Sequence, residues 1–108
     1  MKYMIHYIES SQLTDEILKN NNLIIVEFCI PNSEPCEMQH KVLVELEKEF
    51  CNDITVFKID FAESQFSKIR YDVSSVPTVL FFKDKKELER KVGFTTKEEI
   101  VRIMQELI

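Results

Sequence analysis

The sequence contains a single glycine, Gly93, among its 108 residues. One glycine cannot supply the glycine-rich loop that cradles a nucleotide phosphate, nor the fingerprint of a dinucleotide-binding domain. The chain has only two histidines, and its cysteines lack the spacing of a zinc finger, which argues against a structural metal site. We therefore expect neither a metal nor an organic cofactor.

Long apolar runs and runs of basic residues are also missing. No apolar stretch approaches the roughly 18 residues that span a membrane, and residues 1–9 lack the basic and apolar regions of a signal peptide. No run of Lys and Arg exceeds two residues, and the net charge is −5. Such a charge balance argues against nucleic acid or an anionic membrane as the main partner. We expect a cytoplasmic protein.

The composition, 44% apolar and 31% charged, is typical of a globular protein. A chain of 108 residues is long enough for one hydrophobic core and too short for two domains, so we predict a single domain over residues 1–108. Its three cysteines are an odd count without an export signal, which argues against a disulfide framework. Cys51, at the end of a predicted helix, is expected to be a passive thiol.

The pattern of apolar residues predicts strands alternating with helices. The run 23–30 is interrupted only by Glu27, which is typical of a strand buried on both faces. Strands are expected over 4–8, 23–30, 54–61, 78–82 and 88–92, and helices over 13–20 after a cap at Ser10 or Ser11, over 36–50 and 64–71, and after a cap at Thr95 or Thr96. This order predicts an α/β fold, a central mixed sheet with helices on both faces, closed by an antiparallel hairpin.

Four segments, in order along the chain, carry a resemblance to a known family. They are Val26-Glu27-Phe28, Ser33-Glu34-Pro35-Cys36 at the start of a predicted helix, Val76-Pro77-Thr78 before a predicted strand, and Lys91-Val92-Gly93. In this order and spacing, the sequence resembles the thioredoxin family over essentially its whole length. The resemblance implies the thioredoxin fold and a role in thiol–disulfide exchange and redox homeostasis. The implied partners are protein or peptide thiols and disulfides, with glutathione as a further candidate.

The Ser-x-x-Cys segment, residues 33–36, departs from the family pattern at its first position. Family members usually have Cys-Gly-Pro-Cys there, and their first cysteine, activated at a helix N-terminus, attacks the substrate disulfide. The second cysteine then resolves the mixed disulfide. Because a hydroxyl cannot replace the attacking sulfur, the resemblance implies a degenerate site in which Ser33 marks the missing nucleophile and Cys36 is the only active-site thiol. Normal dithiol reductase activity is not expected, and whether the chain is an enzyme stays open.

Two charged residues match the surroundings of the family's resolving cysteine. Glu27 stands at the position of a buried acidic residue beneath that cysteine, and Lys58 stands at the position of its partner on the neighbouring strand. Burial of a lone carboxylate disfavours its charged form, and a nearby lysine opposes that effect. The resemblance implies that Glu27 belongs to a structural ion pair, accepts a proton at the thiol site, or does both.

The substrate-binding residues are also implied by the resemblance. Pro77 matches the family's cis-proline, and an X–Pro bond tolerates the cis form far better than any other peptide bond. The backbone of the preceding residue, Val76, would pair with a bound peptide as a short case of strand addition. Pro35 and Thr78 complete the expected set.

The sequence allows two interpretations of several polar and sulfur-containing residues near this segment. Cys29 and Asn32 stand where the family commonly has tryptophan, a residue absent from this chain, which suggests altered substrate handling. Cys36 is either a buried inert thiol or a monothiol that forms mixed disulfides, and a disulfide between Cys29 and Cys36 stays an open alternative. Gln39 and His40 are either exposed at the start of the helix or polarise the site.

Ser33 itself is expected to be the N-cap of its helix, worth about 1 kcal/mol. Catalysis by this serine is not favoured, because no glycine-rich nucleophile elbow is present. Three functional hypotheses follow. The protein is a monothiol exchange protein, a non-catalytic peptide-binding or chaperone-like module, or an engineered Cys-to-Ser form of an ordinary dithiol thioredoxin.

Overall fold

The protein was analysed as a computed structural model that describes residues 6–8, 10–63 and 65–108. Nine elements follow one another in the described residues in the predicted order. They are β1 (His6–Tyr7), α1 (Ser10–Lys19), β2 (Leu23–Cys29), α2 (Glu34–Glu49), β3 (Ile54–Asp60), α3 (Gln65–Arg70), β4 (Thr78–Lys83), β5 (Lys86–Val92) and α4 (Lys97–Leu107). The first part of the predicted strand 4–8 lies outside the described residues.

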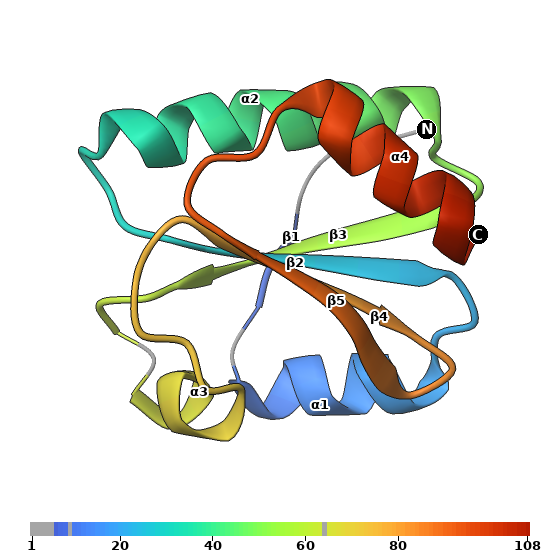
Figure 1. The fold of residues 1–108 in the computed structure, drawn as a ribbon. Coiled ribbons are helices and arrows are strands. Elements are labelled where there is room, and N and C mark those ends of the chain that lie inside the picture. The colour runs from blue at the N-terminus through green and yellow to red at the C-terminus, as the bar shows by residue number, and fades with distance from the viewer. Residues whose placement is uncertain (1–5, 9, 64) are drawn as a thin grey trace.

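The strands form one mixed sheet in the order β1-β3-β2-β4-β5. β1, β3 and β2 run parallel, whereas β4 pairs antiparallel with β2 and with β5. Helices α2 and α4 cover one face of the sheet, and α1 and α3 cover the other (Figure 1). This is the thioredoxin fold, and it confirms the predicted α/β class with helices on both faces and a closing hairpin.

The central strand β2 positions the site because its two faces belong to different cores. All seven of its residues are buried. Leu23 and Ile25 pack in the core beneath α2 and α4, whereas Ile24 and Val26 pack in the core beneath α1 and α3. Since side chains alternate along a strand, Glu27 and Cys29 lie on the α2 side.

The start of α2 is set by local capping. Ser33 has extended backbone angles, φ −112° and ψ 120°, and its Oγ accepts a hydrogen bond from the Cys36 N–H at 3.4 Å. This confirms Ser33 as the N-cap. The helix begins at Glu34, two residues before the predicted start, because Pro35 is tolerated within the first turn, where no intrahelical N–H bond is needed.

Of the two other predicted helix caps, one is confirmed and one is wrong. Thr96 caps α4, and its hydroxyl accepts a hydrogen bond from the Glu99 N–H at 3.3 Å. The prediction that Ser10 or Ser11 caps the first helix is wrong, because both residues lie inside α1, which begins three residues earlier than expected. No helix in the described ranges is long and apolar enough to cross a membrane.

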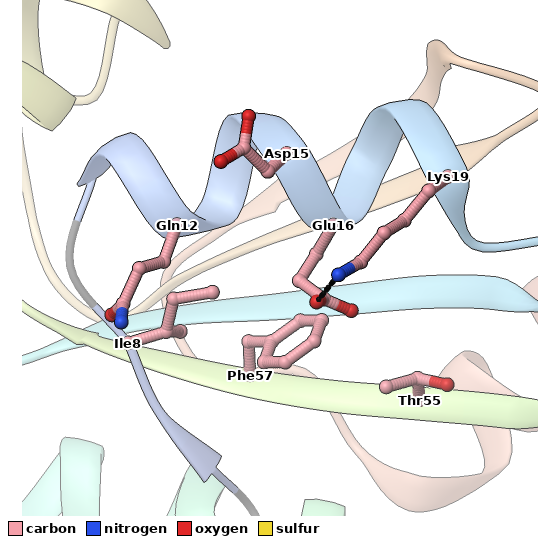
Figure 2. Close-up of a pocket in the computed structure, with 7 residues that line it drawn as sticks. All are labelled: Ile8, Gln12, Asp15, Glu16, Lys19, Thr55 and Phe57. Atoms are coloured by element: carbon pink, nitrogen blue, oxygen red, sulfur yellow. Dashed lines mark ion pairs between the residues drawn. The ribbon is translucent and has the colours of Figure 1, made fainter.

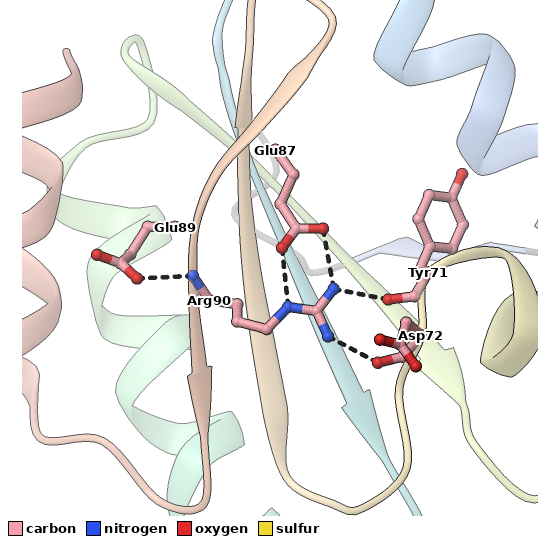
Figure 3. A network of polar contacts seen from close by, with 5 residues as sticks. All are labelled: Tyr71, Asp72, Glu87, Glu89 and Arg90. Atoms are coloured by element: carbon pink, nitrogen blue, oxygen red, sulfur yellow. Dashed lines mark hydrogen bonds and ion pairs between the residues drawn. The ribbon is translucent and has the colours of Figure 1, made fainter.

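Arg90 of β5 holds the segment that leads from α3 to β4 (Figure 3). Its guanidinium donates to the carbonyl oxygens of Tyr71, at 2.6 Å, and Asp72, at 2.7 Å. It also forms a two-point pair with Glu87, at 2.8 and 2.9 Å. The arginine thus ties β5 to the segment that leads into β4.

Candidate functional site

The candidate site lies where β2 ends and β4 begins. Phe28 pairs with Thr78 in the antiparallel register of these strands, which brings the segment before β4 beside the turn that leads into α2. Both segments lie at the same edge of the sheet (Figure 1). The peptide bond between Val76 and Pro77 is cis, as the resemblance predicted.

Cys36 lies in the first turn of α2, with only 2% of its surface exposed. Its Sγ accepts a hydrogen bond from the Ile30 N–H at 3.4 Å. The site therefore holds a buried sulfur in the first turn of a helix, with one backbone N–H group directed at it.

Cys29 is a second thiol in the same site. Its Sγ donates to Glu27 Oε2 at 3.3 Å and lies 3.9 Å from the carbonyl oxygen of Cys36. The two cysteines are free, yet their side chains lie near the distance at which a disulfide forms. Burial raises the pKa of the Cys29 thiol far above its ordinary value, and the Glu27 charge and the Cys36 side chain add to this effect. The pair argues against the expectation that Cys36 is the only active-site thiol.

Glu27 connects the thiols to His40. The carboxylate is fully buried, and its Oε1 lies 2.9 Å from His40 Nδ1. The imidazole is 34% exposed, so it reaches solvent from the buried carboxylate. The sequence leaves the role of His40 open. Its position four residues after Cys36 places both side chains on one face of α2, which indicates that His40 lies near the thiol but not that it meets Glu27.

Lys58 stands beside Glu27 in the parallel register of β2 and β3, as the resemblance implied. It lines a hollow of about 190 Å³ together with Cys36, Glu37, His40 and Lys41. Two lysines, a histidine and a glutamate therefore line this hollow beside Cys36.

Gln39 is buried, so the interpretation that it is exposed at the helix start is wrong. Its Oε1 accepts a hydrogen bond from the Thr95 N–H at 2.8 Å, and its Nε2 donates to the Thr95 carbonyl at 3.2 Å. The side chain thus ties α2 to the loop before α4. In the same region, the Gly93 N–H donates to the Pro77 carbonyl at 2.8 Å, which joins this loop to the cis-proline segment.

The expected substrate-binding residues differ in exposure. Pro35 is exposed and Val76 is half-buried, whereas Pro77 and Thr78 are buried. The Thr78 hydroxyl donates to the Ser75 carbonyl at 2.8 Å and so stabilises the segment before β4. Pro35 and Val76 are therefore the members of this set that solvent can reach.

A larger hollow, of about 510 Å³, lies between α1 and the strands beside it (Figure 2). Glu16 and Lys19 form an ion pair of 3.0 Å at its wall. Phe57, which also lines it, belongs to the core beneath α1 and α3, so this hollow lies on the sheet face opposite the thiols. Among the residues that the structure describes, no group of three or more His, Cys, Asp or Glu could hold a metal ion.

Comparisons with known proteins agree with this architecture. The family model for thioredoxin matches residues 4–106. The chain is 32% identical to a thioredoxin of Chlamydia trachomatis, over 94% of this chain and 96% of that protein, and 36% identical to a thioredoxin of Bacillus subtilis, over 82% of each. The solved structure of an N21Q mutant thioredoxin from Halobacterium salinarum has a TM-score of 0.87 at 25% identity, covering 96% of this chain and 90% of that one. The chain belongs to the thioredoxin family of thiol–disulfide redox proteins.

Proposed function

We propose that this protein exchanges thiols and disulfides with peptides or small disulfides through Cys36, without the reaction that requires a cysteine at position 33. The observation that carries this proposal is the place of Cys36. It lies in the first turn of α2, accepts a hydrogen bond from the Ile30 N–H, and lines the hollow with His40 and Lys58. In the exchange, the Cys36 thiolate attacks one sulfur of a disulfide, a mixed disulfide forms, and the other sulfur leaves as a thiolate.

The neighbouring residues have supporting roles in this proposal. Ser33 caps the helix and does not attack the substrate. Val76 offers its backbone to an extended peptide, and Pro35 adds an exposed ring in the first turn of α2. Glu27 and Lys58 set the charge around the thiol.

The hollow limits what reaches the buried sulfur. Its volume is about 190 Å³, and at about 30 Å³ per water molecule this is room for about six waters. A single extended cysteine or a small disulfide fits this space better than a folded protein surface does. Lys41, Lys58 and Glu37 line its wall, so a substrate that carries both carboxylates and an amino group, as glutathione does, matches these charges. We place the exchange in the cytoplasm, because a reducing compartment keeps these cysteines as thiols.

The experiment uses glutathione disulfide as the substrate, in a Cys51→Ala background that leaves two thiols. Release of glutathione is measured by chromatography, and the protein mass is followed in parallel. We expect release that requires Cys36, so that Cys36→Ala gives none. A Cys36→Ala protein that releases glutathione as fast as its parent would contradict the proposal.

A second candidate is a peptide-binding module without thiol chemistry. The observation that favours it is the burial of both thiols, with Cys29 1% and Cys36 2% exposed. It predicts that a peptide binds equally well to the Cys36→Ala variant, and that the parent releases no glutathione from glutathione disulfide and keeps its mass. The mass measurement above separates the two functions directly.

A further inference from the structure

We infer that Cys29 is the resolving thiol of this site and that Glu27 and His40 carry its proton to solvent. This inference rests on the proposed exchange at Cys36 and names the residues that complete it. It supplies a second sulfur from the strand side of the site, where the family pattern would take both sulfurs from residues 33 and 36.

The first support is the position of Cys29. Its side chain lies on the α2 face of β2, 3.9 Å from the Cys36 carbonyl and near disulfide distance from the Cys36 side chain. Ser33 cannot act as resolving group, because its hydroxyl caps the helix and forms no disulfide. Cys29 is therefore the thiol placed to attack a mixed disulfide at Cys36.

The second support is a route for the proton. Cys29 must lose its proton to attack, and burial opposes that loss. Its Sγ donates to one oxygen of Glu27, and the other oxygen of the same carboxylate lies 2.9 Å from His40 Nδ1. The thiol, carboxylate and imidazole thus form a line from a buried atom to a ring that is 34% exposed.

The charges around this line come from three elements. Glu27 and Cys29 belong to β2, and Lys58 faces them from β3. Cys36, Glu37, His40 and Lys41 face the hollow from α2. On the β4 side, the register partner of Glu27 is Val79, which carries no charge. When Glu27 takes the proton its charge is neutralised, and the repulsion that opposes a Cys29 thiolate is removed.

The reaction balances as follows. Cys29 transfers its proton to Glu27 and attacks the Cys36 sulfur of the mixed disulfide. The Cys29–Cys36 disulfide forms, the bond from Cys36 to the substrate sulfur breaks, and that sulfur leaves as a thiolate, which is protonated from solvent. The two protein thiols are oxidised, and the substrate disulfide is reduced to two thiols. An external dithiol reductant returns the protein to its starting state.

The test counts glutathione released from glutathione disulfide, in the Cys51→Ala background. We expect two equivalents from the parent, whose final mass is lower by two hydrogens. Cys29→Ala should release one equivalent and keep a glutathione adduct on Cys36. A parent protein that keeps its adduct, or a Cys29→Ala variant that releases two equivalents, would overturn the inference. If the parent and Cys29→Ala each release one equivalent and only Cys36→Ala releases none, the exchange at Cys36 stands and the role of Cys29 is refuted. No release from the parent would refute the proposed function itself.

His40 is tested on the second release alone. His40→Asn preserves a polar side chain beside Glu27 but removes the imidazole that would carry the proton, and Lys48→Ala, at an exposed position of the same helix, is the control. We expect His40→Asn to slow the second release on the order of 100-fold, to change the pH profile of that step, and to leave the first release unchanged. If His40 has only a structural role, asparagine should replace it without loss of the second release. Parental kinetics and a parental pH profile in His40→Asn would therefore overturn the part assigned to His40. Urea unfolding of each variant checks that the fold persists.

Discussion

Gln39 offers the sharpest test of how the site is held together. Its amide makes two hydrogen bonds to the backbone of Thr95, and the side chain is fully buried. Gln39→Ala would leave the Thr95 N–H and C=O without these partners and would open a cavity between α2 and the loop. A buried backbone group that loses its partner costs about 1–3 kcal/mol. We therefore expect the free energy of unfolding to fall by about 3–5 kcal/mol, a large share of the roughly 5–15 kcal/mol typical of a domain.

The assay is equilibrium unfolding in urea, followed by far-ultraviolet circular dichroism. Gln39→Met separates the two contributions, because methionine fills the space but can neither donate nor accept these hydrogen bonds. It should retain a loss of about 2–4 kcal/mol. Glu45→Ala, at an exposed position of the same helix, is the control and should change stability by less than about 0.5 kcal/mol. A Gln39→Met protein as stable as the parent would refute the view that these two hydrogen bonds anchor the loop.

Three further predictions concern other parts of the chain. Ser33→Cys places a sulfur at the N-cap of α2, so this variant should reduce insulin disulfides at a rate that the parent does not reach, as measured by turbidity with a dithiol reductant. An inactive Ser33→Cys variant would remove the main reason for treating position 33 as the missing nucleophile. Burial raises the pKa of Cys29, so the unfolded chain releases this proton first as the pH rises past 9.0, and the free energy of unfolding should fall by about 1.4 kcal/mol per pH unit there. Cys29→Ala should lack that contribution, and equal slopes in urea unfolding at several pH values would contradict it. Arg90→Ala removes two hydrogen bonds to loop carbonyls and should lower stability by about 1–3 kcal/mol in urea unfolding, whereas Lys85→Ala in the exposed hairpin turn should have little effect.

The fold was predictable because its strongest signals are local. The apolar run of β2, interrupted only by Glu27, indicated a strand buried on both faces, and all seven residues of that strand are buried. The start of α1 was missed because its first turn carries polar residues that also occur in caps. Residues 33–36 and Pro77 were located through family resemblance, and the cap and the cis bond agree with it.

The polar contacts of the site were harder to predict, for a physical reason. Helical periodicity shows which residues share a face, but it does not show which distant group meets them. Gln39 finds its partner 56 residues further along the chain. His40 and Glu27 meet only because α2 folds back over the end of β2. The role of Cys29 depends on a sulfur-to-carboxylate contact that a strand pattern alone does not contain.

The outer strand β5 has a consequence for how an extended peptide can approach the protein. Its sequence, KELERKV, carries a charged side chain at five of seven positions, and most of the strand is exposed. A strand that paired with β5 would place its side chains against the lysines, arginine and glutamates of this edge strand. These charged residues therefore disfavour edge-to-edge association of chains. If a peptide pairs with the backbone of Val76, as we propose, the charged side chains of β5 keep this edge from competing for it.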